Sequence, residues 1–278
     1  MTGCDNFCSY CAVPYTKGRE KSRRWEDIIK ETEKAIEEGA KEIWLLGQNV
    51  NSYKGGVTFA QLLEKVNKIK GDFWIRFASP HPKDFSPELV KTMANCKKVT
   101  EYLNLPAQSG DNKILKAMNR PYTVEAYKEI IDFVKKEIPE IVISTDIIVG
   151  FPGETEKNFR NTVKLFTEVG FEMAYISRYS PRPGTAAEKI KDNISTGEKK
   201  RREKVLTEIL KEISLAKNKE YKEKIVDVLV LKKKKHLIGK TRGYKSVVFP
   251  GSIKLVGSFV KVKITHASPW GLKGKLSS

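Results

Sequence analysis

Residues 124–150, VEAYKEIIDFVKKEIPEIVISTDIIVG, contain the pattern of an amphipathic helix followed by that of a buried strand. Apolar residues recur every three or four positions up to Ile138, and residues 142–149 are then mostly apolar. The same order, helix before strand, is found at 25–40 and 42–47, 59–69 and 73–78, 86–94 and 101–106, and 156–170 and 172–180. Mostly apolar strands about 30 residues apart predict a parallel sheet covered by helices, either a barrel or an open doubly wound sheet.

Each predicted strand is followed by a segment rich in Gly, Pro, Ser, Asn and Gln. These segments are GQNVNSYKGG (47–56), SPHPKDF (79–85), PAQSGDN (106–112), GFPGET (150–155) and SPRPGTAA (180–187). In a parallel sheet they lie at one end, where both barrels and doubly wound folds bind ligands. Ordinary connecting loops are the alternative, but simple turns do not need Gln, Asn and His. The sequence therefore predicts a polar site at this end.

The C-terminal part differs in pattern and in charge. Residues 196–220 predict a long basic helix, and residues 221–278 contain short alternating runs broken by Gly and Pro, which are typical of a small antiparallel β-barrel. Residues 199–278 carry 22 Lys and Arg against 6 Asp and Glu, whereas residues 1–198 carry 30 against 28. We therefore expect a near-neutral enzyme core over 1–195, a linking helix over 196–220 and a nucleic-acid-binding module over 221–278. A solubilising lysine surface is the alternative.

Three of the four cysteines, Cys4, Cys8 and Cys11, lie within eight positions of one another. No apolar run is long enough to cross a membrane and no leader is apparent, so we expect a cytoplasmic protein. In a reducing cytoplasm clustered thiols favour a metal centre over disulfides. A closed zinc site needs a fourth ligand, and His81 and Cys96 belong to unrelated units. An iron–sulfur cluster held by three cysteines instead leaves one iron open for chemistry.

This cysteine spacing ahead of a parallel β/α array resembles the radical S-adenosylmethionine (SAM) superfamily, and within it the methylthiotransferases of the MiaB type, which modify tRNA. The resemblance covers residues 3–187 in order. It rests on GCDNFCSYCAVPYTKGREKSR, WLLGQNVNSYKG, RFASPHP, LNLPAQSGDNKILKAMNRPYT, TDIIVGFPGET and YSPRPGTAA. The C-terminal GKTRGYKSVVFPG and VGSFVKVKITHASPWGLKGKL resemble the RNA-binding TRAM domain. The fold implied is α/β, a partial TIM-like (β/α) barrel followed by a small all-β, OB-like TRAM domain.

The resemblance also implies roles for individual residues. A 4Fe-4S cluster would be held by Cys4, Cys8 and Cys11, and its open iron would chelate SAM. Contacts with SAM would come from Tyr10, Gln48, Asn49, Gln108, Ser109, Thr145, Asp146, Ile148 and Gly150. Tyr10, Ile148 and Gly150 would lie beside the adenine, and the others near the methionyl and ribose parts. Loop capping or hydrogen bonding within the barrel is the alternative for each of these side chains.

The implied reaction is methylthiolation at C2 of an N6-isopentenyladenosine next to the anticodon of tRNA. Attack on such a C–H bond needs a radical and a dry pocket. The partners implied are a tRNA anticodon stem-loop and an electron donor such as flavodoxin or ferredoxin. Three alternatives stay open: methylthiolation of a ribosomal-protein aspartate, methylthiolation of threonylcarbamoyl-adenosine in tRNA, and a non-catalytic RNA-binding role.

Two features of the family are missing from this sequence. Members carry an N-terminal domain with three further cysteines for a second 4Fe-4S cluster, and a first barrel strand that leads into the cysteine loop. We therefore expect this chain alone to bind and cleave SAM at most, and we expect an unpaired sheet edge where the first strand belongs.

Basic residues interleaved with aromatic residues suit an unstacked RNA loop, because phosphates supply affinity and rings offer stacking. On this ground the sequence predicts RNA contacts from Lys240, Arg242, Tyr244, Lys245 and Trp270. Arg19 and Arg23 belong to a basic segment just after the cysteines and are predicted to meet RNA phosphates near the site.

Overall fold

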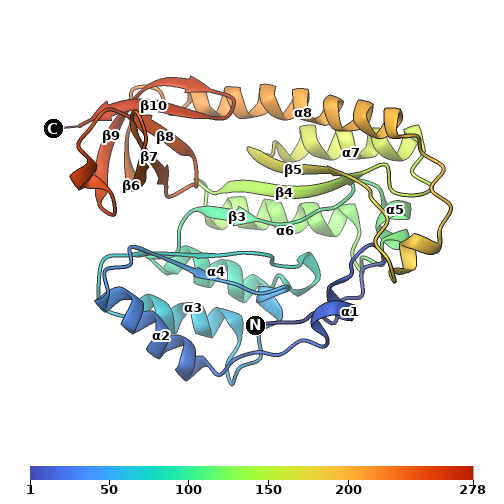
Figure 1. Ribbon diagram of the computed structural model, residues 1–278, viewed down its shortest axis with the longest axis horizontal. Coiled ribbons are helices and arrows are strands. Elements are labelled where there is room, and N and C mark those ends of the chain that lie inside the picture. Colours follow the sequence, from blue (N-terminus) through green and yellow to red (C-terminus); the bar gives the residue numbers. More distant parts are fainter. Residues whose placement is uncertain (278) are drawn as a thin grey trace.

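The computed structural model describes residues 1–277, and its first unit is an open barrel of parallel strands (Figure 1). The strands are β1 (Glu42–Leu45), β2 (Trp74–Phe77), β3 (Tyr102–Asn104), β4 (Val142–Val149) and β5 (Met173–Arg178). Pairing is parallel between β1 and β2, between β3 and β4 and between β4 and β5. A parallel bridge joins Ile75 of β2 to Val99, which lies shortly before β3. The expected partial (β/α) barrel is thereby confirmed.

Helices cover one face of this sheet. The longer ones are α2 (Trp25–Glu37), α3 (Phe59–Lys68), α4 (Pro87–Asn95), α6 (Val124–Glu137) and α7 (Glu156–Val169). Shorter pieces are α1 (Val13–Lys17), α5 (Asn112–Ala117), η1 (Val50–Ser52), η2 (Pro82–Asp84) and η3 (Ala186–Lys189). Strand residues such as Ile75 and Val149 pack against the helices in one large core. Ser86 caps α4 with Pro87 in its first turn, as the sequence predicts.

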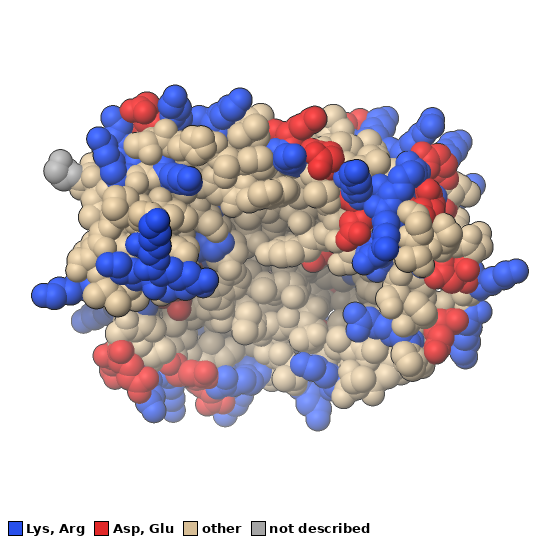
Figure 2. Space-filling view, turned by 45° about the horizontal axis from the view of Figure 1, so that its top comes forward, with Lys and Arg blue, Asp and Glu red and all other residues tan. Residues whose placement is uncertain are grey.

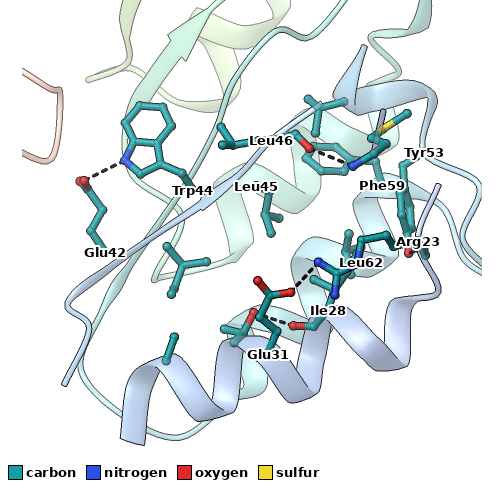
Figure 3. Close-up of a pocket in the computed structure, with 15 residues that line it drawn as sticks. Arg23, Ile28, Glu31, Glu42, Trp44, Leu45, Leu46, Tyr53, Phe59 and Leu62 are labelled. Carbon is teal, nitrogen blue, oxygen red and sulfur yellow. Dashed lines mark hydrogen bonds and ion pairs between the residues drawn. The ribbon is translucent and has the colours of Figure 1, made fainter. Parts of the chain in front are cut away.

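The outer edge of β1 pairs with no strand among residues 1–277. A cavity of about 370 Å³ lies there between β1 and α2, and Leu45 points into it while Trp44 points to the opposite side of the strand (Figure 3). The N-terminal ammonium of Met1 donates to the Leu46 carbonyl, with 3.1 Å between N and O, beside this cavity. The unpaired edge that the sequence predicts is therefore present among the described residues, and it is lined mainly by apolar side chains.

The C-terminal part begins with α8 (Thr196–Lys219), which lies along β5 and α7 (Figure 1). A closed barrel follows, built from β6 (Ile225–Lys233), β7 (Leu237–Thr241), β8 (Ser246–Phe249), β9 (Phe259–Ser268) and β10 (Gly271–Leu276), with η4 (Ile253–Leu255) before β9. Its strands run in the spatial order β10-β8-β7-β6-β9 and enclose a core of their own. In the part of the chain that the structure describes, no helix is long and apolar enough to cross a membrane.

A buried arginine joins the two barrels. Arg76 on β2 points to the face opposite the helices and is only 1% exposed. Its Nε lies 2.6 Å from Glu42 Oε1, and its Nη1 donates to Thr100 Oγ1 at 2.7 Å. Nη1 and Nη2 also donate to the backbone carbonyls of Arg242 and Thr241, at 2.6 and 2.8 Å. One guanidinium thus holds the β7–β8 turn against the amino ends of the parallel strands.

Of four residues expected to contact RNA, three take part in this interface instead. Tyr244 stacks on Tyr102, with ring centroids 4.8 Å apart, and meets Trp44 edge-on. Arg242 forms a bidentate pair with Glu101, Lys245 pairs with Glu172 at 2.7 Å, and Lys240 donates to Ser246 Oγ. Arg242, Tyr244 and Lys245 are thus used within the protein, which corrects the expectation that they form a free RNA-binding surface. Lys240 bonds within the C-terminal barrel, and its contact with RNA stays a prediction. Basic and aromatic side chains serve a stacked, ion-paired protein interface as well as they serve RNA.

Replacing Arg76 with leucine should destabilise the protein by about 3–5 kcal/mol, because two backbone carbonyls and the Glu42 carboxylate lose their buried partner. Denaturant unfolding measures the loss, and proteolysis should cut the link between the barrels faster. Arg160→Leu is the matched control, since its pair with Glu156 is exposed and contributes about 0.5 kcal/mol or less. Equal effects of the two substitutions would contradict a joining role for Arg76.

Candidate active site

The cysteine loop is closed at its base by a short antiparallel bridge. Thr2 and Lys21 exchange two backbone hydrogen bonds of 3.0 and 2.8 Å, and the Cys4 amide donates to the Gly18 carbonyl. Gly3 has φ +72°, and a Cβ added to it would lie 2.1 Å from the Arg19 carbonyl oxygen. Only glycine fits at this crossing, because any side chain would push the two backbone segments apart.

The three thiols of this loop are free and lie close enough to influence one another. Cys4 is buried, while Cys8 and Cys11 are partly exposed. Burial raises the pKa of Cys4 and of Cys11, and for both thiols the negative charge of Cys8 acts in the same direction. Within residues 1–277 no three Cys, His, Asp or Glu side chains are gathered tightly enough to hold one metal ion. A larger centre such as an iron–sulfur cluster fits more widely spread thiolates than one zinc ion with 2.3 Å bonds does.

The end of α5 and the turn after it hold the cysteine loop through side-chain hydrogen bonds. Ser9 Oγ donates to the Ala117 carbonyl at 2.8 Å, and Asn119 Nδ2 donates to the Phe7 carbonyl at 2.9 Å. Asn119 adopts the left-handed region, with φ 56°, to make this contact. The loop that follows β3 therefore fixes where the cysteines lie relative to the sheet.

Arg120, on the same turn, lies directly against a cysteine. The residue is 8% exposed, and its Nη1 is 3.5 Å from Cys8 Sγ. Its Nε donates to the Tyr122 hydroxyl at 2.8 Å and its Nη2 to the Pro106 carbonyl at 3.1 Å. A buried cation held in this way can interact favourably with the negative charge of a cluster and its ligands. Sequence reasoning assigned no role to Arg120, although it belongs to the NRPYT segment that carries the resemblance.

Polar atoms without partners remain near the carboxyl ends of three strands. His81 Nδ1 accepts from the Lys83 amide, which leaves Nε2 to carry the proton, and this buried Nε2 has no partner among the described residues. The buried Oδ1 atoms of Asn49, after β1, and of Asn104, at the end of β3, have none either. Buried polar atoms without partners are costly, so these atoms suit a polar ligand. Sequence reasoning missed His81 and Asn104 in this role.

Of the predicted SAM contacts, the structure gathers Tyr10, Ile148 and Asp146 near the cysteine loop. Tyr10 and Ile148 pack against the same small apolar cluster around Phe151 and Met118. Burial raises the pKa of the Asp146 carboxyl, while a hydrogen bond with Asn104 and the charge of Arg120 oppose that rise. Tyr10 and Ile148 thus form an apolar surface near the polar and charged side chains of Asn104, Asp146 and Arg120.

Other predicted contacts are engaged within the protein. Thr145 is fully buried, donates to the Leu105 carbonyl and accepts from the Ala107 amide, both at 2.9 Å. Ser109 is 1% exposed and accepts from the Asp111 amide. The hydroxyls of Thr145 and Ser109 thus hold the β3 loop, and their contact with SAM stays a prediction. Asn49 Nδ2 is bound to Asp84, whereas its Oδ1 stays unpaired.

The side chains of Gln48 and Gln108 remain accessible, whereas Gly150 is held in place by Glu154 and α8. Gln48 is exposed and Gln108 is partly exposed, with φ 65° and a backbone bridge to Ile147. The Gly150 amide donates to Glu154, whose carboxylate is paired with the buried Arg202 of α8 at 2.6 Å. A Cβ at Gly150 would collide with the Lys199 side chain. The α8 helix therefore holds the GFPGE turn next to Ile148.

Comparison with known families agrees with this arrangement. A family model of the Radical SAM superfamily matches residues 1–166, and one of the TRAM domain matches residues 219–277. The chain belongs to the radical SAM superfamily. This membership implies a 4Fe-4S cluster and SAM as its cofactors, and the free Cys4, Cys8 and Cys11 with their buried cation fit such a cluster.

Sequence relatives of this radical SAM chain are named tRNA-2-methylthio-N(6)-dimethylallyladenosine synthase. The relative from Thermoanaerobacter sp. (strain X514) is 50% identical over 99% of this chain and 60% of its own length. The relative from Moorella thermoacetica is 47% identical over 99% of this chain and 64% of its own length. The chain thus spans about three fifths of the length of these curated relatives.

Solved structures support the fold alone. Coproporphyrinogen III oxidase (HemN) from Escherichia coli matches 91% of this radical SAM chain and 66% of its own, with a TM-score of 0.58 at 15% identity. The methyltransferase TsrM from Kitasatospora setae matches 67% of this chain and 37% of its own, with a TM-score of 0.57 at 18% identity.

His81 should make the stability of this chain depend on pH. Burial lowers the pKa of His81 to about 2, and the charges of Arg120 and Lys83 act in the same direction. In the unfolded chain His81 binds a proton below about pH 6.5, whereas in the folded chain it does not. Its contribution to stability is therefore complete above pH 6.5 and falls by about 1.4 kcal/mol per pH unit below it.

Unfolding by urea at pH 7.5, 6 and 5 measures this slope. His81→Asn should reduce the change of the unfolding free energy with pH by about 1.4 kcal/mol per pH unit. Substitution of the exposed His236 by asparagine should leave this slope unchanged. An unchanged slope in His81→Asn would show that the histidine is not buried in its neutral form.

Proposed function

We propose that this chain is the SAM-cleaving and RNA-binding part of a MiaB-type tRNA methylthiotransferase. The observation that carries the proposal is the group of three free thiols on one clamped loop, with the buried Arg120 against Cys8, at the mouth of an open parallel barrel. The names of the sequence relatives support the substrate class. The proposed reaction transfers a methylthio group to C2 of an adenosine in tRNA. This adenosine lies next to the anticodon and already bears an isopentenyl group on N6.

We assign cluster binding, charge compensation and adenine packing to different residues according to their chemistry. Cys4, Cys8 and Cys11 would hold the 4Fe-4S cluster, which supplies the electron for reductive cleavage of SAM when bound. Arg120 would offset the negative charge of the sulfur ligands. Tyr10 and Ile148 offer the apolar wall that an adenine ring needs, since they face the Phe151 cluster from two elements.

The polar end of SAM needs donors and acceptors that the protein has not already used. His81 offers an Nε2–H donor, and Asn104 offers an Oδ1 acceptor. Asp146 lies beside Asn104, and the accessible Gln48 and Gln108 flank this region from β1 and β3. We therefore assign the amino, carboxylate and ribose groups of SAM to these side chains.

RNA would approach the face that Figure 2 shows, where a hollow lined mainly by uncharged side chains has Lys and Arg on its rim. Lys232 to Lys235 are all exposed, and Trp270 is 60% exposed. Arg19 and Arg23 are also exposed, but they pair with Asp5 and Glu31. Exposed cations such as Lys232 to Lys235 supply the sequence-independent part of RNA affinity.

Completion of the reaction would need parts outside this chain. We assign the second 4Fe-4S cluster to the portion of the relatives that the chain does not span, and the electron to a donor such as flavodoxin or ferredoxin. The working compartment would be the cytoplasm, where tRNA is modified.

Anaerobic reconstitution with iron and sulfide tests the cluster and the chemistry together. The wild-type chain should bind one 4Fe-4S cluster, seen by iron content and absorbance, and should release 5′-deoxyadenosine when SAM and dithionite are added. Cys8→Ala should lose both signals, because two thiolates do not hold the cluster. Cys96→Ala is the matched control, since this thiol lies in the core away from the loop and its loss should leave iron binding intact. A wild-type chain that takes up no iron would refute the proposal.

The tRNA nucleosides of a strain that lacks the complete gene separate the substrate classes. Mass spectrometry should show loss of 2-methylthio-N6-isopentenyladenosine, with its unmethylthiolated precursor accumulating. Unchanged methylthioadenosines would favour the ribosomal-protein branch, and loss of the threonylcarbamoyl form alone would favour the third branch.

A further inference from the structure

A second concave site lies where β5, α8 and the C-terminal barrel meet. Its volume is about 200 Å³, and its walls include Tyr175 of β5, Asn218 of α8 and Trp270 of the turn between β9 and β10. Tyr175 is 55% exposed and Trp270 is 60% exposed, although both are large aromatic residues. Two exposed rings on the rim of one pocket are unusual, because side chains of this size normally bury most of their surface.

The pocket also has polar groups that a ligand could use. Asn218 is 2% exposed, and its Nδ2 donates to the carbonyls of Ser268 and Pro269 at 2.8 and 3.2 Å. Its Oδ1 is left without a partner among the described residues. The half-buried Lys240 contributes a cation, with Nζ 4.0 Å from the centre of the Tyr244 ring. An unused acceptor and a cation beside exposed rings are a suitable combination for a nucleobase and its phosphate.

The position of Tyr175 links this pocket to the cysteine loop. β5 is the edge strand of its sheet, and Tyr175 pairs in register with Asp146 of β4. In a parallel sheet such partners lie on the same face, so both side chains point away from the covering helices. The charge of Arg120, which contacts Cys8, acts on Asp146. Tyr175 in the pocket wall therefore lies on the same face of the sheet as Asp146, whose carboxyl is influenced by the arginine that contacts Cys8.

We propose that this pocket binds one unpaired base of the RNA substrate, a neighbour of the base that reacts, through stacking on Tyr175 and Trp270. The proposal rests on the proposed function and names a subsite within it. Stacking on a ring tolerates any base, and the unpartnered Asn218 acceptor favours a base with an exposed amino or imino hydrogen. The site would hold the RNA strand so that the target base, a short distance along it, reaches the radical.

The test combines protein variants with abasic RNA. The probe is a fluorescein-labelled RNA hairpin with the loop sequence of an anticodon that is followed by adenosine, and its affinity for the full chain is measured by anisotropy at fixed salt. Tyr175→Ala and Trp270→Ala should each weaken binding about 5- to 100-fold. Tyr175→Phe keeps a ring and should bind as the wild type does. Ile253→Ala is the matched control, because Ile253 is 65% exposed on the same barrel and lies outside the pocket.

Replacing each loop nucleotide in turn with an abasic one then locates the base. One position other than the target adenosine should weaken wild-type binding by a similar factor and should have little further effect on Tyr175→Ala. The subsite is refuted, and the proposed function survives, if the hairpin binds tightly but no abasic effect depends on Tyr175 or Trp270. Both fail if the chain binds the hairpin no better than a duplex without a loop.

Discussion

The common direction of β1 to β5 is the constraint on which the site depends. Because the five strands are parallel, the segments that follow them lie at one end of the barrel, and the cysteine loop meets the turn after α5 there. Nothing in the cysteine loop itself would hold three thiols near His81, Asn104 and Asp146. The sheet places His81, Asn104 and Asp146 at the end of the barrel where Arg120 contacts Cys8, although Cys4 and Asp146 are 142 positions apart in the chain.

At the opposite end of the barrel, the C-terminal barrel covers aromatic side chains of the parallel strands. An open barrel leaves the strand face opposite the helices unprotected, and here Trp44, Trp74 and Tyr102 occupy that face at the amino ends of the strands. The turn of the C-terminal barrel that carries Tyr244 covers them, and Arg76 fastens it through backbone carbonyls. A buried ion pair adds little net stability compared with apolar packing, but breaking it is costly. The C-terminal barrel is therefore part of the folded unit rather than a tethered appendage.

The sequence predicts the order of helices and strands because hydrophobic periodicity and caps are local properties. The capped start of α4 at Ser86 and the buried strand over 142–149 needed no tertiary information. The role of Arg242, Tyr244 and Lys245 could not be predicted in that way. Their charge and aromaticity are the same whether the partner is RNA or the β3 and β5 regions of the same chain, and only packing decides between them.

Arg120 and His81 were missed for a related reason. An arginine in a loop normally faces solvent, and its burial against Cys8 depends on Pro106 and Tyr122 from the same loop. His81 is defined by an atom without a partner, which no sequence pattern reveals. Sequence pattern thus identified the cysteines by their spacing, whereas the residues that tune their surroundings follow from the three-dimensional contacts.

The fixed interface between the two barrels has a consequence for chemistry at a distance. A radical reacts with whatever hydrogen is nearest, so its target must be held in place before it forms. In this protein the basic surface at Lys232 to Lys235 and the pocket at Trp270 belong to the C-terminal barrel, while the cysteines lie at the far end of the parallel strands (Figure 1). Because Arg76, Arg242 and Tyr244 fix one barrel on the other, packed protein rather than a flexible linker sets the distance between the proposed RNA-binding surface and the cysteines. Arg242, Tyr244 and Lys245 thus help to fix the position of the surface that we propose binds RNA.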